Sequence, residues 1–260
     1  MMKTDVHDKR IFRLTIPFHD IYTTVYVLKT VNGALLFDTG TYDSDPKEYI
    51  FPFLKQLEIS PEMLKYVFLS HNHLDHSGGL KAFMREFPNA TIVSCSQKVM
   101  DDFGSYQTLL PVDGDELFDG VRVVTIPGHS LDSCGILDTF SNTLISGDSL
   151  QLYGIYGSGV WGTSVVFPNE YMQSLDKLEK MAVDRLLLSH NFHPLGHECV
   201  GKSEVAEAIR HCREALEEIV KLIKANEALN DREITALCNC RGLPTLHERV
   251  VTRAREYLKQ

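Results

Sequence analysis

Alternating apolar and polar positions in the first 200 residues predict short strands separated by helices. Residues 11–16 and 21–28 alternate and are rich in β-branched side chains, as expected for neighbouring antiparallel strands. Apolar runs typical of buried strands follow at 34–37, 66–69, 90–94, 121–126, 134–138, 143–145 and 185–188. Helical spacing of apolar residues occurs at 46–58, 79–87, 97–103 and 170–181. This order predicts an α/β (α+β) fold in which helices cover sheets and polar loops at strand ends share one edge.

The pattern changes after residue 200. Apolar residues recur at helical spacing through 204–228, and two shorter helices are predicted at 231–239 and 245–258. The apolar stripe of the long helix is typical of core packing. We therefore expect a first domain at residues 1–200 and a helical C-terminal extension at residues 201–260 that packs on it.

The stretch from Ser70 to Gly79 follows one predicted strand and is unusually rich in metal-binding side chains. His71, His73, Asp75 and His76 place three imidazoles and a carboxylate within six residues. Crowding such groups is costly without a cation, because protonated imidazoles repel one another and stripped polar groups destabilise a fold. The i, i+2 histidines can face one ion, and the Asp-His pair suits a second. The stretch predicts a binuclear metal site, and the alternative is a histidine-rich surface loop.

Further candidate ligands stand at the ends of other predicted strands. Asp38 can accept a hydrogen bond from a ligand imidazole, although capping a turn is the commoner role of such an aspartate. His129 follows Gly128 at a strand end, and His190 follows the apolar run 185–188. Asp148 also follows a glycine, and its two carboxylate oxygens can bridge two cations. Histidine and aspartate are ligands of zinc, iron or manganese rather than of calcium.

Composition and charge narrow the range of partners. Lys and Arg number 26 against 35 Asp and Glu, which gives a formal net charge of −9 and no basic block. Nucleic acid is therefore not expected as a partner, because binding the phosphate backbone relies on clustered Lys and Arg. No secretory signal or membrane-length apolar run is evident, so we expect a cytoplasmic protein that acts on a small molecule without a membrane. A homodimer is one assembly that the sequence leaves open.

The cysteines and the remaining histidines give weaker signals. Six cysteines are scattered without a framework spacing, as expected for reduced thiols. Cys238 and Cys240 can bind a metal, but a core position at a helix end is the commoner role for such a pair. His193 can reach a substrate from the loop after His190, and a capping or surface role is the alternative. His197 has no assigned role.

The segment 151–168 combines four glycines with large aromatic residues. A segment with so many glycines has few side chains to pack in a core, and so many aromatic rings are unusual in a solvated loop. We expect a mobile segment that covers the substrate, and a plain packed connector is the alternative. The aromatic residues that would line a substrate pocket are Tyr153, Tyr156, Trp161 and Phe167.

Taken in order, these motifs resemble those of the metallo-β-lactamase superfamily of hydrolases, over residues of about 11–195. The matching residues are Asp38 in Phe-Asp-Thr-Gly, the block 71–76, His129 in Pro-Gly-His-Ser, Asp148 in Ser-Gly-Asp-Ser, and His190. The resemblance implies a four-layer αββα sandwich that holds two divalent ions, with zinc expected first and iron or manganese as alternatives. It also implies three ligands for each ion and one bridging carboxylate: His71, His73 and His129; Asp75, His76 and His190; and Asp148.

The resemblance also implies a reaction. A hydroxide bridging the ions would attack the substrate, and Asp75 would guide the proton. Aspartate at position 148, rather than cysteine, is similar to the glyoxalase II, lactonase and phosphodiesterase branches. The first hypothesis is hydrolysis of a small ester, lactone or thioester. The alternatives are a phosphodiester or phosphotriester hydrolase of the same fold, and a ligand-binding or regulatory protein of low activity that keeps the metal site.

Overall fold

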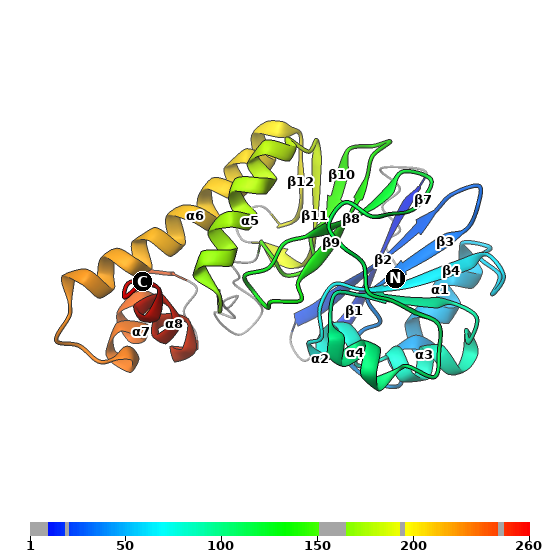
Figure 1. Cartoon of the computed structure of the whole chain (residues 1–260), viewed down its shortest axis with the longest axis horizontal. Helices are drawn as coiled ribbons and strands as arrows, with labels where there is room; N and C mark the ends of the chain where they lie inside the picture. Colours follow the sequence, from blue (N-terminus) through cyan, green and yellow to red (C-terminus); the bar gives the residue numbers. More distant parts are fainter. Residues whose placement is uncertain (1–9, 19–20, 151–164, 193–195, 244–246) are drawn as a thin grey trace. The chain divides into compact units, whose positions relative to one another are not determined.

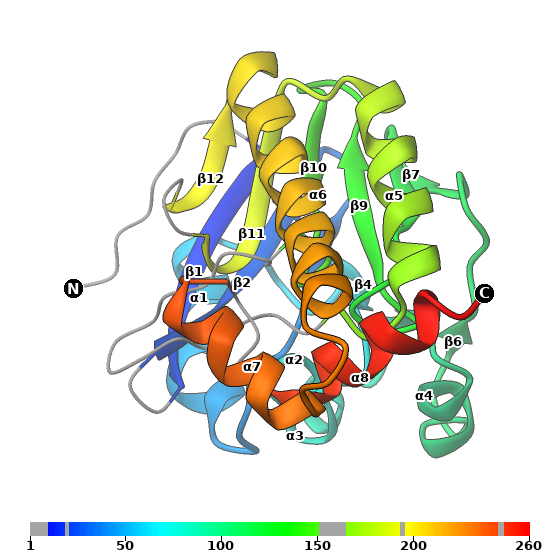
Figure 2. The same ribbon diagram turned by 90° about the vertical axis from the view of Figure 1, so that its left-hand side faces the viewer.

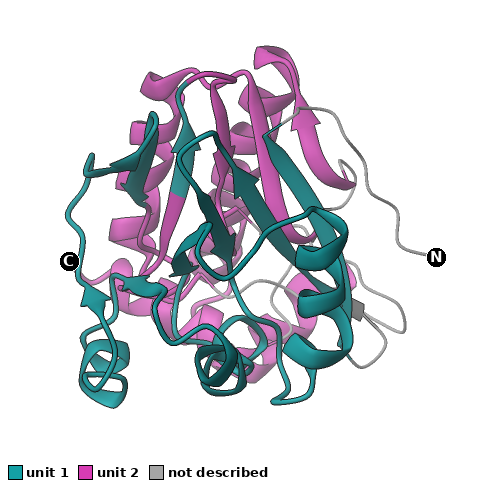
Figure 3. Cartoon of the chain, turned by 90° about the vertical axis from the view of Figure 1, so that its right-hand side faces the viewer, with its two compact units in different colours: residues 1–125, 136–139 teal, residues 126–135, 140–260 magenta. Residues whose placement is uncertain are grey.

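The computed structural model describes residues 10–18, 21–150, 165–192, 196–243 and 247–260. Its strands and helices follow the order expected from the sequence (Figure 1). The chain divides into two compact units, residues 1–125 with 136–139, and residues 126–135 with 140–260 (Figure 3). The expected boundary after residue 200 lies within the second unit and stays a prediction.

The first unit contains a six-stranded sheet in which strand order equals chain order. Its strands are β1 (Ile11–Phe18), β2 (Ile21–Lys29), β3 (Ala34–Phe37), β4 (Leu64–Leu69), β5 (Thr91–Ser94) and β6 (Thr108–Leu109). The first three pair antiparallel, and β3 to β6 pair parallel. Because β3 and β4 are parallel neighbours, the residues that follow their carboxyl ends emerge at the same edge of the sheet.

Helices of the first unit supply the apolar cover of this sheet. They are α3 (Leu80–Glu86), α4 (Gln97–Asp102), and a π-helical turn, η1 (Pro46–Ile50), that continues into α1 (Phe51–Gln56). The short helix α2 (Leu74–Ser77) contributes no residue to the apolar cluster. Strand residues Val27 and Leu36 share a buried cluster with Phe53 and Phe83 from the helices. The predicted helix at 46–58 is thus two joined elements, and the single helix predicted at 79–87 is preceded by the extra turn α2.

The second sheet has the strand order β12-β11-β10-β9-β8-β7 and is also mixed. The strands are β7 (Glu116–Phe118), β8 (Val121–Thr125), β9 (Cys134–Asp138), β10 (Thr143–Ile145), β11 (Arg185–Phe192) and β12 (Gly196–Val200). Asp119 and Gly120 both have positive φ in the turn between β7 and β8, as a two-residue hairpin requires. The predicted strand at 185–188 is longer than expected, so His190 lies within β11 rather than after it.

The described residues of the second unit form four helices: α5 (Pro168–Met181), α6 (Lys202–Ala225), α7 (Asp231–Cys240) and α8 (Glu248–Tyr257). Helices α5 and α6 pack side by side, and α6 also contacts β11 and β12 (Figure 2). A capping box formed by Asn230 and Glu233 starts α7. The helices expected after residue 200 are therefore present. No helix in the described ranges has both the length and the apolar character needed to cross a membrane.

Close backbone contact fixes the turn that follows α2. A Cβ atom on Gly78 would lie 1.8 Å from the carbonyl oxygen of Thr41 and 2.6 Å from that of Leu74. Such distances are far below van der Waals contact, so only glycine fits at this position. The residues after β3 and the turn after α2 can therefore lie against each other only because residue 78 has no side chain.

We expect Gly78→Ala to lower the free energy of unfolding by about 3 kcal/mol or more, because the added methyl group forces two backbone segments apart. Urea denaturation followed by circular dichroism measures this change. Gly104→Ala is the matched control in the same unit, because a Cβ there meets no atom closer than 3.4 Å. Equal stability of the two variants would contradict the close contact at Gly78.

Candidate metal centre

In the first unit, the loop between β4 and α2 brings two histidine rings together. His71 is buried, and its Nε2 atom lies 2.8 Å from Nδ1 of the more exposed His73. The i, i+2 spacing predicted this convergence. Both ring nitrogens are within reach of one ion, since zinc binds histidine nitrogen at about 2.0–2.1 Å.

His76 is oriented by a carboxylate that arrives from the end of β3. Its Nδ1 donates to Oδ2 of Asp38 at 2.7 Å. Ser70 donates to the same carboxylate from its backbone N–H at 2.8 Å and from its hydroxyl at 2.9 Å. A hydrogen bond to a carboxylate places the imidazole proton on Nδ1, which leaves the lone pair on Nε2. That Nε2 atom lies 3.4 Å from Oδ2 of Asp75.

Asp38 is fully buried and has a positive φ of 64°. Burial raises the pKa of its carboxyl group, while the charge of His76 and the hydrogen bonds from His76 and Ser70 act in the opposite direction. A buried carboxylate is tolerated only when it is hydrogen-bonded. The three donors around Asp38 therefore also fix the position of the segment that carries His71 and His76, which consists of the loop after β4 and helix α2.

In the second unit, one carboxylate lies between two histidines. His129 Nε2 is 3.6 Å from Oδ2 of Asp148, and His190 Nε2 is 3.5 Å from Oδ1. All three residues are buried. The two distances are too long for hydrogen bonds. Each oxygen of Asp148 thus faces a different histidine, as expected for a carboxylate that binds an ion on each side.

The spacing of three donor pairs fits transition-metal coordination, whereas the ring nitrogens of His71 and His73, at 2.8 Å, lie closer together than that. Two ligand atoms about 2.1 Å from one tetrahedral ion lie roughly 3.4 Å apart. The pairs His76–Asp75, His129–Asp148 and His190–Asp148 have separations of 3.4, 3.6 and 3.5 Å. Imidazole nitrogen with carboxylate oxygen suits zinc, iron or manganese. The side chains that could hold a metal ion are His71, His73, Asp75, His76, His129, Asp148 and His190.

The loop that carries His129 is held by the segment before α5. The carbonyl oxygen of Gly128 accepts hydrogen bonds from the backbone N–H groups of Val166 and Phe167. A Cβ on Gly128 would lie 2.5 Å from the ring of Tyr171, so the loop approaches α5 closely. Phe167 itself lies at the start of α5, and the guanidinium of Arg253 is 5.9 Å from the centre of its ring.

Other residues singled out in the sequence have mixed outcomes. Tyr153, Tyr156, Trp161 and His193 lie outside the described residues, so their expected pocket role stays a prediction. Cys238 is buried in α7 whereas Cys240 is exposed, which agrees with a core position for Cys238. His197 lies in β12 and is partly exposed.

Ser70 is the residue that sequence reasoning missed. Its hydroxyl and its backbone N–H both donate to Asp38, but no pattern in the sequence assigns it a role. Its position between the apolar strand and the first histidine is the one sequence feature that could have identified it. A serine at the end of a strand is too common for this position to indicate a role.

Comparison with known proteins agrees with these features. Residues 20–100 match the model of the metallo-beta-lactamase superfamily. A beta-lactamase-like protein 2 homolog of Caenorhabditis elegans is 28% identical over 225 residues, which cover 84% of this chain and 71% of that protein. A hydroxyacylglutathione hydrolase of Salmonella typhi is 32% identical over 157 residues, covering 59% of this chain and 57% of that enzyme.

An atrochrysone carboxyl ACP thioesterase of Emericella nidulans is 33% identical over 161 residues, covering 60% of this chain and 47% of that enzyme. The chain thus spans about half the length of some of the relatives that it matches.

Solved structures show the same fold. A metallo-beta-lactamase family protein of Thermus thermophilus superposes with a TM-score of 0.66 at 18% identity, covering 96% of this chain and 93% of that one. A flavo di-iron protein of Thermotoga maritima gives a TM-score of 0.63 at 15% identity, covering 87% and 71%. The α/β fold class predicted from the sequence is therefore confirmed, and residues 20–100 of this chain match the metallo-β-lactamase superfamily.

Proposed function

We propose that this protein is a binuclear metal-dependent hydrolase of small thioesters, esters or lactones. The observation that carries the proposal is the Asp148 carboxylate, which directs one oxygen toward His129 and the other toward His190. A carboxylate placed in this way suits a bridge between two ions. The match to the superfamily and the hydrolase names of the relatives support the same conclusion.

The ligands are proposed in two sets that share Asp148. His71, His73 and His129 would hold the first ion, and Asp75, His76 and His190 the second. Neutral imidazoles and carboxylates make zinc our first choice, with iron or manganese able to use the same donors. When bound, such ions lower the pKa of a coordinated water to about 7 and polarise the substrate oxygen.

The protein's own residues would position these groups and move the proton. Asp75 keeps 19% of its side chain exposed, so its carboxylate is accessible to an attacking water. It would accept the proton released in the attack and pass it to the leaving group. Asp38 would act through His76, by keeping the proton on Nδ1 and the lone pair on Nε2.

Thioesters are our preferred substrate class. Hydroxyacylglutathione hydrolase and ACP thioesterase, the names of two relatives, both denote enzymes that cleave an acyl group from sulfur. The leaving thiolate needs little protonation because its pKa is about 8.5. For such a leaving group, the partly exposed carboxylate of Asp75 is sufficient for the proton transfer.

Substrate panels test the reaction class. We expect metal-reconstituted protein to hydrolyse acyl thioesters with a kcat/KM at least about tenfold above that for bis-p-nitrophenyl phosphate, with lactones and oxygen esters between them. Release of thiol or nitrophenol, followed by absorbance, measures the rates. Turnover of the phosphodiester alone would contradict the proposal. A protein that hydrolyses none of these substrates but retains a co-purified small molecule would be a binding protein instead.

Loss of the bridging carboxylate tests the binuclear site. Asp148→Ala should lose at least one metal equivalent together with activity, because it removes a ligand from both ions and leaves His129 and His190 without their common partner. Inductively coupled plasma mass spectrometry measures the metal content. The control is Asp101→Ala, which changes an exposed aspartate on α4. Full metal occupancy in Asp148→Ala would refute a bridging role.

Orientation of His76 can be tested separately. Asp38→Asn should weaken metal binding by about 10–100-fold, because the amide no longer holds the imidazole in one tautomer. Ser70→Ala removes one of the hydrogen bonds to Asp38 and should have a smaller effect. Competition with a chelator measures affinity, and circular dichroism shows whether each variant is folded. Wild-type affinity in a folded Asp38→Asn variant would rule out this role.

A further inference from the structure

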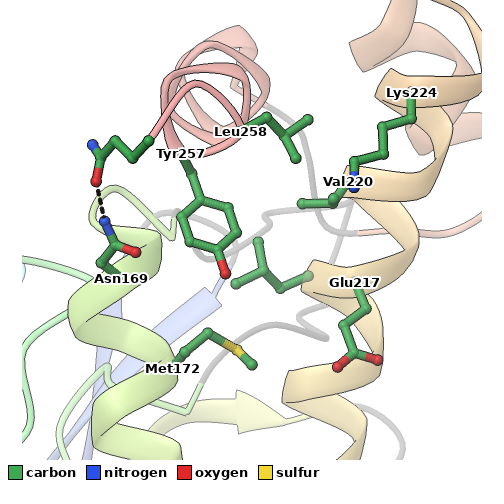
Figure 4. A pocket seen from close by; sticks show the side chains of 9 residues that line it. Asn169, Met172, Glu217, Val220, Lys224, Tyr257 and Leu258 are labelled. Carbon is green, nitrogen blue, oxygen red and sulfur yellow. Dashed lines mark hydrogen bonds between the residues drawn. The ribbon is translucent and has the colours of Figure 1, made fainter.

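Helices α5, α6 and α8 of the second unit line an open cavity of about 450 Å³ (Figure 4). Its walls are mainly apolar: Met172 from α5, Leu216 and Val220 from α6, and Tyr257 and Leu258 from α8 and its C-terminal end. Pockets that bind small molecules usually measure about 300–1,000 Å³ and have such a lining. None of the residues that line the cavity is a proposed metal ligand.

The phenol oxygen of Tyr257 faces the apolar side chains of the lining. Figure 4 shows the ring of Tyr257 between the three helices, with its phenol oxygen pointing into the cavity. Within the described parts of the chain, no hydrogen bond is made by this oxygen. A phenol hydroxyl in apolar surroundings gains free energy when it finds a partner. A ligand with one hydrogen-bonding group would provide that partner.

The charges around the cavity cancel. Glu217 and Lys224 are the two charged side chains of its lining, and both are exposed on α6. They lie seven residues apart, or about 10 Å along the helix axis. On the opposite side, the amide of Asn169 donates to Oε1 of Gln260 at 2.5 Å, so these two groups satisfy each other. Exposed charges contribute little to binding, and here neither sign prevails.

We propose that this cavity binds a small uncharged amphipathic molecule. Its aliphatic body would lie against Leu216, Val220 and Leu258, and a single hydroxyl or carbonyl group would form a hydrogen bond with Tyr257. A charged head group on the same body would have to lose its hydration without gaining a buried counter-ion, which is unfavourable. The cavity therefore discriminates between ligands by the charge of the head group.

The test compares three probes that share one aliphatic chain: 1-octanol, octanoate and octylamine. Each is titrated into the metal-loaded full chain. The chemical shift of the ¹³C-labelled methyl group of Met172, assigned with Met172→Leu, reports on occupancy of the cavity. We expect 1-octanol to saturate this shift and both charged probes to bind at least about tenfold more weakly. A charged probe that binds as tightly as 1-octanol would overturn the proposal.

Three variants locate the site. Val220→Trp places a large ring in the cavity and should weaken 1-octanol binding by at least about tenfold. Tyr257→Phe removes only the hydroxyl and should weaken it by about threefold to tenfold. Val200→Trp is the matched control, because Val200 is 57% exposed on β12 and does not line the cavity. It should bind like the wild type.

Each outcome decides the proposal. Wild-type affinity in a folded Val220→Trp variant would show that 1-octanol binds elsewhere. If Val220→Trp does not fold, Tyr257→Phe alone tests the site, because phenylalanine keeps the shape of the side chain. Unchanged affinity for 1-octanol in Tyr257→Phe would overturn the proposed hydrogen bond. Equal weakening in Val200→Trp would also overturn it.

Discussion

The buried carboxylate of Asp38 is the constraint on which the metal-binding loop of the first unit depends. A carboxylate that is buried away from water requires hydrogen-bond donors. Ser70 donates two hydrogen bonds to Asp38, and His76 donates a third. Two further hydrogen bonds join the same segments, because Thr39 donates to the carbonyl oxygen of His76 from both its N–H and its hydroxyl. The residues after β3 are thus joined to α2 through both the side chain and the backbone carbonyl group of His76. Neither can shift without leaving polar groups unsatisfied.

A related arrangement occurs in the second unit, with one difference. Asp38 makes short hydrogen bonds, whereas the contacts of Asp148 with His129 and His190 are 3.5–3.6 Å long. Short contacts hold a side chain in place, and the longer ones leave the separation that ligands of a common ion require. The two aspartates therefore have different tasks although both follow a strand and lie beside histidine. One orients a ligand, and the other is itself arranged as a ligand.

Sequence reasoning succeeded where the information is local. The apolar run before Ser70 and the spacing of the histidines predicted β4 and the paired rings of His71 and His73, because neighbours in the chain determine both. It failed where pairing is non-local. The polar residues Ser189 and His190 suggested the end of a strand, but pairing of Phe192 with Gly196 in β12 continues β11 past them. The short strands β6 and β7 are likewise defined by their partners rather than by their own two or three residues.

The helical C-terminal region shows a further limit of sequence patterns. The apolar stripe of α6 was interpreted as core packing, and this is right for Ile209, Ile219 and Ile223, which are buried. Periodicity identifies the apolar face of a helix, but it does not show whether neighbouring side chains fill the space in front of it. That space depends on α8, which is held to α7 by the ion pair between Arg255 and Asp231. Because α8 also packs against α5 and α6, the volume beside Leu216 depends on the positions of several helices. Covering apolar surface with apolar groups is favourable, so a pocket between packed helices is a place where a ligand can supply contacts that the chain does not.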